Sequence, residues 1–131
     1  MRPSTIIAIV LMLEVTDTAA SANCGELQTQ VEMNQCASHD YAKADRELTM
    51  LYNEYWARLS EDRKRQLRDA QLAWLKFRDL SCSFESSGVR GGSVYPLMLN
   101  TCLATMTRAR LQQLTVLANC KEGDLSCTVW E

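Results

Sequence analysis

Three long stretches of the sequence repeat apolar side chains at intervals of three and four residues, which is the spacing of one face of an α-helix. The three faces consist of Tyr41, Ala44, Leu48, Tyr52, Tyr55 and Leu59, then Leu67, Ala70, Trp74, Phe77 and Ser81, then Leu99, Leu103, Met106, Leu114 and Leu117. No strand pattern, with its period of two, competes with them. The sequence therefore predicts an all-α fold, a small antiparallel helical bundle.

Residues that cap helices indicate where the first helix begins. Thr29 and Glu32 have the spacing of a capping box, in which each side chain accepts a hydrogen bond from the other residue's backbone amide. Ser38 marks a second possible start, just before the regular helical period begins. We predict a long helix over residues 38–59.

Ser60 is followed by two carboxylates, which suit the positive end of a new helix dipole. We therefore predict a second helix over residues 61–85. Because the connection around Ser60 is so short, this helix is expected to run antiparallel to the first as a hairpin.

The segment over residues 86–92 is rich in serine and glycine, which release helical geometry. Ser93 can cap the next helix, and Pro96 then falls in a first turn, where its missing N–H costs nothing. We predict a third helix from about 94 to 118, followed by a non-helical tail over residues 119–131.

The beginning of the chain has the features of a secretory signal peptide. One positive charge precedes an apolar run over residues 6–13, which is shorter than the roughly 20 residues that span a bilayer. Residues 20–22 are small, as signal peptidase requires, so we expect cleavage after Ala22. The sequence predicts a signal peptide over residues 1–22 and a periplasmic or secreted domain over residues 23–131 with no stable membrane anchor.

The charge balance does not favour a nucleic-acid partner. The whole chain has a formal net charge of −2, and the predicted domain one of −1, because the leader carries one basic and two acidic residues. Nucleic-acid-binding domains instead concentrate basic residues on one face.

All the cysteines lie after the predicted cleavage site, and an even number of cysteines in an exported chain indicates disulfides. They are Cys24, Cys36, Cys82, Cys102, Cys120 and Cys127. A zinc site would need closely spaced pairs of ligands, and this chain has wide spacings and a single histidine, so we expect no metal. The first four cysteines are expected to pair among themselves in a connectivity that the sequence leaves open, and the last two to close a small loop of their own.

The predicted helix faces also carry polar groups at positions where apolar ones are expected. They are Asp45, Gln71, Arg78, Thr107 and Arg110. Asp45 precedes Ser60 by 15 residues and Arg78 follows it by 18, so a hairpin places the two at a similar height. We predict that Asp45 and Arg78 form an ion pair inside the bundle, with Gln71 and Arg110 close by, as a structural polar core.

The residues that enzymes use are missing from this pattern. The one histidine, His39, adjoins a possible helix cap and is expected at the surface, and no serine or cysteine has a base predicted beside it. The sequence has no nucleophile elbow, phosphate loop or dinucleotide-binding fingerprint. We therefore predict a protein that is not an enzyme, has no catalytic residue and binds no cofactor.

A series of motifs runs through most of the chain. It comprises Thr29-x-x-Glu32-Met33-Asn34-x-Cys36, Ala44-Asp45-x-x-Leu48-x-x-x-Tyr52, Leu67-Arg68-x-Ala70-Gln71-x-x-Trp74-x-x-Phe77-Arg78-Asp79-x-x-Cys82, Gly91-Gly92-Ser93, Cys102-Leu103 and Thr107-x-x-Arg110-x-x-x-Leu114. With these motifs the sequence resembles the LprI-like lysozyme-inhibitor family of bacterial envelope proteins. Two features depart from the family pattern: Thr49, where an asparagine is common, and the tail with Cys120 and Cys127.

The resemblance implies an exported helical protein that binds a protein partner such as a lysozyme. An inhibitor must fill the sugar cleft and offer donors to the two catalytic carboxylates of the enzyme. The predicted loop supplies such groups, and we expect the partner to bind at Arg90, Gly91, Gly92, Ser93 and Tyr95. The alternatives are that this segment only connects two helices, and that the protein is an assembly accessory of the envelope that binds a different protein.

Overall fold

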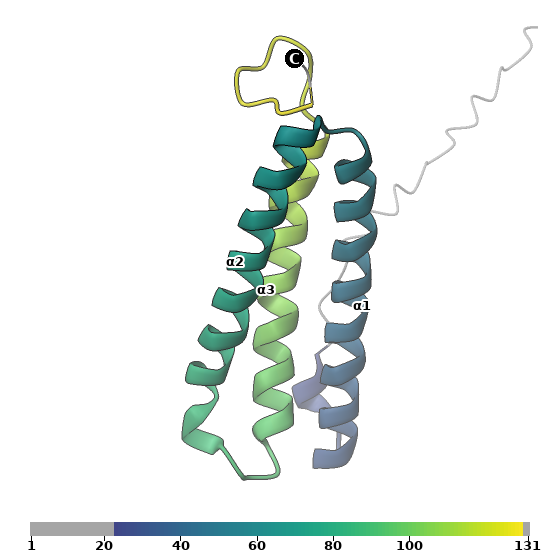
Figure 1. Cartoon of the computed structure of the whole chain (residues 1–131). Coiled ribbons are helices and arrows are strands. Elements are labelled where there is room, and N and C mark those ends of the chain that lie inside the picture. The colour runs from purple at the N-terminus through teal and green to yellow at the C-terminus, as the bar shows by residue number, and fades with distance from the viewer. Residues whose placement is uncertain (1–22, 130–131) are drawn as a thin grey trace, which may run out of the picture.

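The structure is a computed structural model that describes residues 23–129, and the predicted signal peptide over residues 1–22 lies outside this part. The described residues form a bundle of three long helices without any strand, so the predicted all-α fold is confirmed (Figure 1). Along the chain the elements are η1 (Cys24–Glu26), α1 (Gln30–Ala57), α2 (Glu61–Glu85), η2 (Ser87–Val89) and α3 (Tyr95–Ala118). Within residues 23–129, none of the helices is both long enough and apolar enough to cross a bilayer.

The helix α1 begins at the predicted capping box. The Glu32 amide donates to the Thr29 hydroxyl at 3.2 Å, and the Thr29 amide donates to the Glu32 carboxylate at 3.0 Å. The expected second start at Ser38 is wrong, because Ser38 lies inside α1 and the helix runs without a break from Gln30. The capping box already satisfies the first amides of the helix, so no further cap is needed.

The other two helices begin close to the predicted positions but without the predicted serine caps. Ser60 precedes α2, yet its buried hydroxyl makes no hydrogen bond with the described residues. Val94, and not Ser93, is the residue before α3, so the expected cap at Ser93 is wrong. Pro96 does lie in the first turn of α3, as its rigid ring favours.

The helix α1 packs chiefly against α3, to which it runs parallel, and α2 runs antiparallel to both (Figure 1). The buried residues of α1 and α3 include Ala37, Ala44 and Ala104, each only 1% exposed. Such small side chains let two helix backbones approach closely. The antiparallel direction of the predicted hairpin is confirmed, but α2 packs more against α3 than against α1.

The densest part of the apolar core lies toward the α1–α2 turn. Its buried residues are Leu48, Tyr55, Leu59, Leu114 and Ala118. The tail after α3 lies beyond this end of the bundle (Figure 1). Tyr55 and Arg63 bind it through hydrogen bonds to the Thr128 hydroxyl and carbonyl, respectively.

Three disulfides link the described residues, and no cysteine is free. The first holds η1 against α1, the second joins the last turns of α2 to α3, and the third closes the tail. They are Cys24–Cys36, Cys82–Cys102 and Cys120–Cys127. The predicted division into four cysteines and two is confirmed, and the structure selects one of the connectivities that the sequence left open.

Candidate functional site

Two places in the bundle hold the residues that the sequence singled out, and the first is a polar cluster around Arg78 in the middle of the molecule. Arg78 is 5% exposed, although it carries a charge. Its Nη1 atom donates to the Asp45 carboxylate at 3.3 Å and to the Thr107 hydroxyl at 3.2 Å, and its Nε atom donates to Asp79 at 2.9 Å. These bonds satisfy most of a guanidinium that the bundle removes from water.

The predicted contact between Asp45 and Arg78 is therefore present, but the prediction that both lie inside the bundle is wrong. The Asp45 side chain is 47% exposed and the Asp79 side chain 61% exposed. The Arg78 side chain is only 6% exposed, so its guanidinium lies inside the bundle, and the two partly exposed carboxylates reach it from the surface. This arrangement avoids the cost of burying a carboxylate.

Aromatic rings complete the surroundings of the cluster. The Arg78 guanidinium lies 5.2 Å from the ring centre of Trp74 and 5.3 Å from that of Tyr41. Burial raises the pKa of Tyr41, although the neighbouring Arg78 opposes this shift. Gln71 and Arg110, which were predicted close to this pair, contact each other: Arg110 donates to the Gln71 side chain at 3.0 Å and lies 5.8 Å from the Trp74 ring centre.

A groove of about 490 Å³ lies between α1 and α2, with Asp45, Gln71 and Arg78 among its lining residues. The two carboxylates that line the groove, Asp45 and Asp79, both contact Arg78. In the described part of the chain, no three carboxylate, cysteine or histidine groups gather as metal ligands would. The bonds within the cluster join all three helices, so a structural role accounts for its geometry.

The second place is the loop between α2 and α3, where the predicted partner-binding residues lie. Arg90, Gly91, Gly92 and Ser93 are all exposed. Gly91 has a φ of 83°, a conformation that favours glycine. Tyr95 is the first residue of α3 and is half-buried, so less of its ring faces a partner than the sequence indicated.

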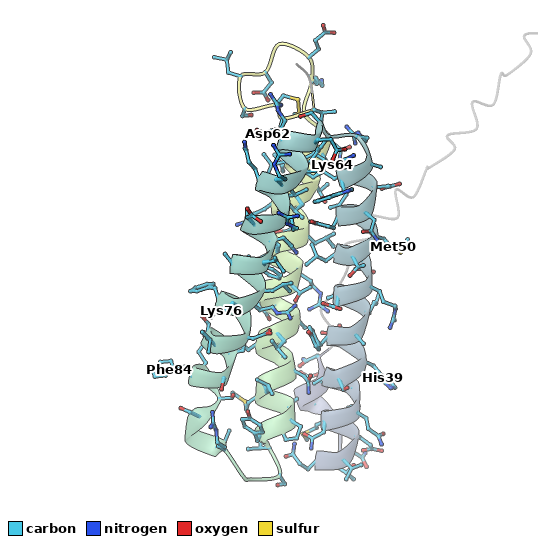
Figure 2. All side chains as sticks on the ribbon, in the orientation of Figure 1. His39, Met50, Asp62, Lys64, Lys76 and Phe84 are labelled. Atoms are coloured by element: carbon cyan, nitrogen blue, oxygen red, sulfur yellow. A yellow bond between two sulfur atoms is a disulfide. The ribbon has the colours of Figure 1, made fainter. Side chains whose placement is uncertain are left out.

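The structure adds exposed apolar residues that the sequence pattern missed. Phe84, in the last turn of α2, is 79% exposed and projects away from the bundle (Figure 2), and Val89 is 37% exposed. Phe77 was predicted in the core, but it is 62% exposed because the adjacent Arg78 takes the buried position. The spacing of these residues in the sequence could have predicted this exposure. Phe77, Leu80 and Phe84 lie three and four residues apart, on a face of the helix turned away from Gln71 and Cys82.

We define the loop-end surface as the exposed residues at this end of α2 and in the loop. They are Phe84, Val89, Arg90, Gly91, Gly92 and Ser93. The surface lies at the opposite end of the bundle from the tail (Figure 1). His39, on the outer face of α1, is exposed and separate from it (Figure 2).

Comparison with known proteins assigns the chain to a family. The sequence model of a family described as "Lysozyme inhibitor LprI" matches residues 20–114. The chain belongs to the LprI family. An uncharacterised protein of Rhizobium meliloti (strain 1021) is 32% identical over 114 residues, which cover 77% of this chain and 82% of that relative. No solved structure matches the chain.

The LprI family is described as one of lysozyme inhibitors, and not of enzymes. The polar cluster and the loop-end surface both lie within the matched residues. The disulfide-closed tail lies beyond them. Proteins of the LprI family act in the periplasm or outside the cell.

Proposed function

We propose that this protein binds a lysozyme and blocks its sugar-binding cleft with the loop-end surface. The observation that carries the proposal is an exposed arginine, Arg90, held in place within the part of the chain that matches the LprI family. Arg90 donates to the Ser83 hydroxyl at 2.9 Å, and no carboxylate of the described residues pairs with it. Its charge is therefore available to a partner.

The chemistry of the target explains why an arginine suits it. A lysozyme cleaves its substrate with two carboxyl groups that flank the scissile bond. A guanidinium has a planar fork of donors that can bind a carboxylate through two parallel hydrogen bonds. Gly91 and Gly92 lack side chains, so the backbone beside Arg90 can approach the walls of a cleft closely.

The apolar part of the loop-end surface supplies the contact area that a stable complex needs. Aromatic and arginine side chains dominate the energetics of protein interfaces. Phe84 and Arg90 both lie at the end of α2, because the Arg90 side chain is bonded to Ser83, the residue before Phe84. Phe84 is therefore the aromatic anchor of this surface in place of Tyr95, which is half-buried.

The loop-end surface is held in shape before any partner arrives. The Cys82–Cys102 disulfide joins the two helices that flank the loop, with 5.6 Å between the Cα atoms. The Asn34 side chain, from the start of α1, donates to the Ser93 carbonyl at 2.9 Å. A loop that is already ordered loses less conformational entropy on binding, which favours affinity.

The test is inhibition of lysozyme by the purified, oxidised chain over residues 23–131. Loss of cell-wall turbidity measures enzyme activity. Because removal of an interface anchor costs 2 kcal/mol or more, Arg90→Ala and Phe84→Ala should each weaken inhibition about 30-fold. Arg46→Ala, which removes an exposed arginine from α1, is the matched control and should inhibit as well as the wild type.

Circular dichroism should show unchanged helix content in each variant, since both side chains are exposed. If Arg90→Ala and Phe84→Ala inhibit as strongly as the wild type, the loop only connects two helices. If the wild-type protein inhibits no lysozyme of animal or bacterial type, the proposal fails.

A second function is favoured by the outer face of α2. Phe77, Leu80 and Phe84 form an apolar stripe, each at least 61% exposed. Exposed apolar stripes of this kind occur where another protein docks. Such a face would suit an assembly accessory that binds a different envelope protein, and Phe77→Asp would then abolish that binding without affecting lysozyme.

A further inference from the structure

A pocket of about 610 Å³ lies between α2, α3 and the disulfide-closed tail, which we call the tail pocket. Its lining includes five leucines: Leu59, Leu67, Leu114, Leu117 and Leu125. The volume falls in the range of pockets that hold small organic ligands. The tail lies beyond residues 20–114, so one wall of the pocket is built from residues outside the family match.

The wall contributed by α3 carries a positive charge. Arg110 is half-buried, and burial lowers its pKa. Its Nε atom donates to Gln71 at 3.0 Å and its Nη1 atom to Gln113 at 3.3 Å, and both acceptors are neutral amides. Unlike Arg78, Arg110 forms no ion pair with a carboxylate of residues 23–129.

The charged groups at the mouth of the pocket do not neutralise Arg110. The Asp62 carboxylate accepts hydrogen bonds from Arg65 at 2.8 Å and from Gln66 at 2.7 Å, so it already has a cation beside it. Arg63 also lines the pocket and donates to the Thr128 carbonyl of the tail. The pocket therefore combines leucine side chains with Arg110, a cation that has no carboxylate partner among residues 23–129.

We infer that the tail pocket binds an anionic amphiphile with one alkyl chain. A carboxylate or phosphate headgroup would accept hydrogen bonds from Arg110, and the alkyl chain would lie along the leucines. Burial of the alkyl chain and a charge-assisted hydrogen bond to the headgroup both favour binding. The inference is independent of the proposed lysozyme binding, which uses the other end of the bundle.

The headgroup chemistry is shared by free fatty acids and by single-chain phospholipids. Laurate and a lauroyl lysophosphatidylglycerol therefore serve as the two anionic probes, each kept below its critical micelle concentration. Dodecyltrimethylammonium has a chain of the same kind with a cationic head, and dodecanol has one with a neutral head. Isothermal titration calorimetry on the oxidised chain over residues 23–131 should show binding of at least one anionic probe and no binding of the cationic one.

Three variants test where the probe binds. Arg110→Gln keeps a polar side chain without the charge and should weaken binding of the anionic probe at least about tenfold. Ala70→Trp, at an exposed position that lines the pocket, should fill the space and abolish binding while leaving the core intact. Arg46→Gln removes an equal charge from the far face of α1 and should bind like the wild type.

Equal affinity for laurate and dodecyltrimethylammonium would overturn the inference, as would binding that survives in Ala70→Trp. Failure of both anionic probes to bind the wild type would also overturn it. If Arg110→Gln does not fold, Ala70→Trp and the comparison of headgroups still decide the question.

Discussion

At the scale of single residues, the most informative group is Arg78, a buried cation with two partly exposed carboxylates. Because Asp45 and Asp79 both contact it, loss of either one leaves the other in place. Asp45→Ala and Asp79→Ala should each cost about 1 kcal/mol or less, as partly exposed ion pairs do. The double variant should cost about 3–5 kcal/mol, because it leaves Arg78 buried without a counter-charge.

Urea unfolding of the oxidised protein measures these effects. Glu54→Ala, which removes an exposed carboxylate from α1, is the control and should change stability by less than about 0.5 kcal/mol. The prediction is wrong if the double variant is destabilised only by the sum of the single ones, since residues that share a partner are expected to be non-additive.

The contact between Asp45 and Arg78 could be predicted from the sequence. The rise per residue of a helix gives the distance of each residue from the turn along the helix axis, and these two distances are similar. The sequence was not enough to decide which of two adjacent residues is buried. Phe77 and Arg78 are adjacent in the sequence, about 100° apart around the helix axis, so the helical period of the other residues fits with either one toward the core. The hydrophobic rule favoured Phe77, but the structure gives Arg78 partners on both α1 and α3 and leaves Phe77 exposed.

At the scale of helices, the parallel contact between α1 and α3 is the feature that the sequence did not reveal. Several buried residues of these two helices are alanines, which give a weaker apolar signal than leucine or phenylalanine. The capping box and the short connection at Ser60 predicted the start of α1 and the direction of α2 correctly, because they act locally. Which helix faces pack most closely depends on all three helices together.

Ala104 provides a direct test of this close contact. It is 1% exposed on α3, so Ala104→Leu adds three carbon atoms where no space is available and should destabilise the protein by about 1–3 kcal/mol. Ala109→Leu makes the same change at an exposed position of the same helix and should leave stability nearly unchanged. Thermal unfolding followed by circular dichroism compares the two, and equal melting temperatures would contradict close packing at Ala104.

At the scale of the whole molecule, the two proposed binding sites lie at opposite ends of the bundle. The loop-end surface adjoins the start of α3, and the tail pocket adjoins its second half and the tail. The 24 residues of α3 span about 36 Å. The polar cluster around Arg78 lies between the two sites and links the three helices. A substitution in one site therefore changes no residue that contacts the other site.

The predicted signal peptide determines the expected state of the mature chain. Cleavage after Ala22 should give a protein that begins with Asn23, and its three disulfides should lower the mass by six hydrogens relative to the reduced form. Disulfides persist outside the cytoplasm, where oxidants maintain them. Mass spectrometry of the protein recovered from the periplasm or medium of a bacterial host measures both features.

Ala22→Arg, which replaces the small residue required for cleavage, should leave the leader attached. A wild-type chain that retains Met1, or one with an alkylatable thiol, would contradict the prediction.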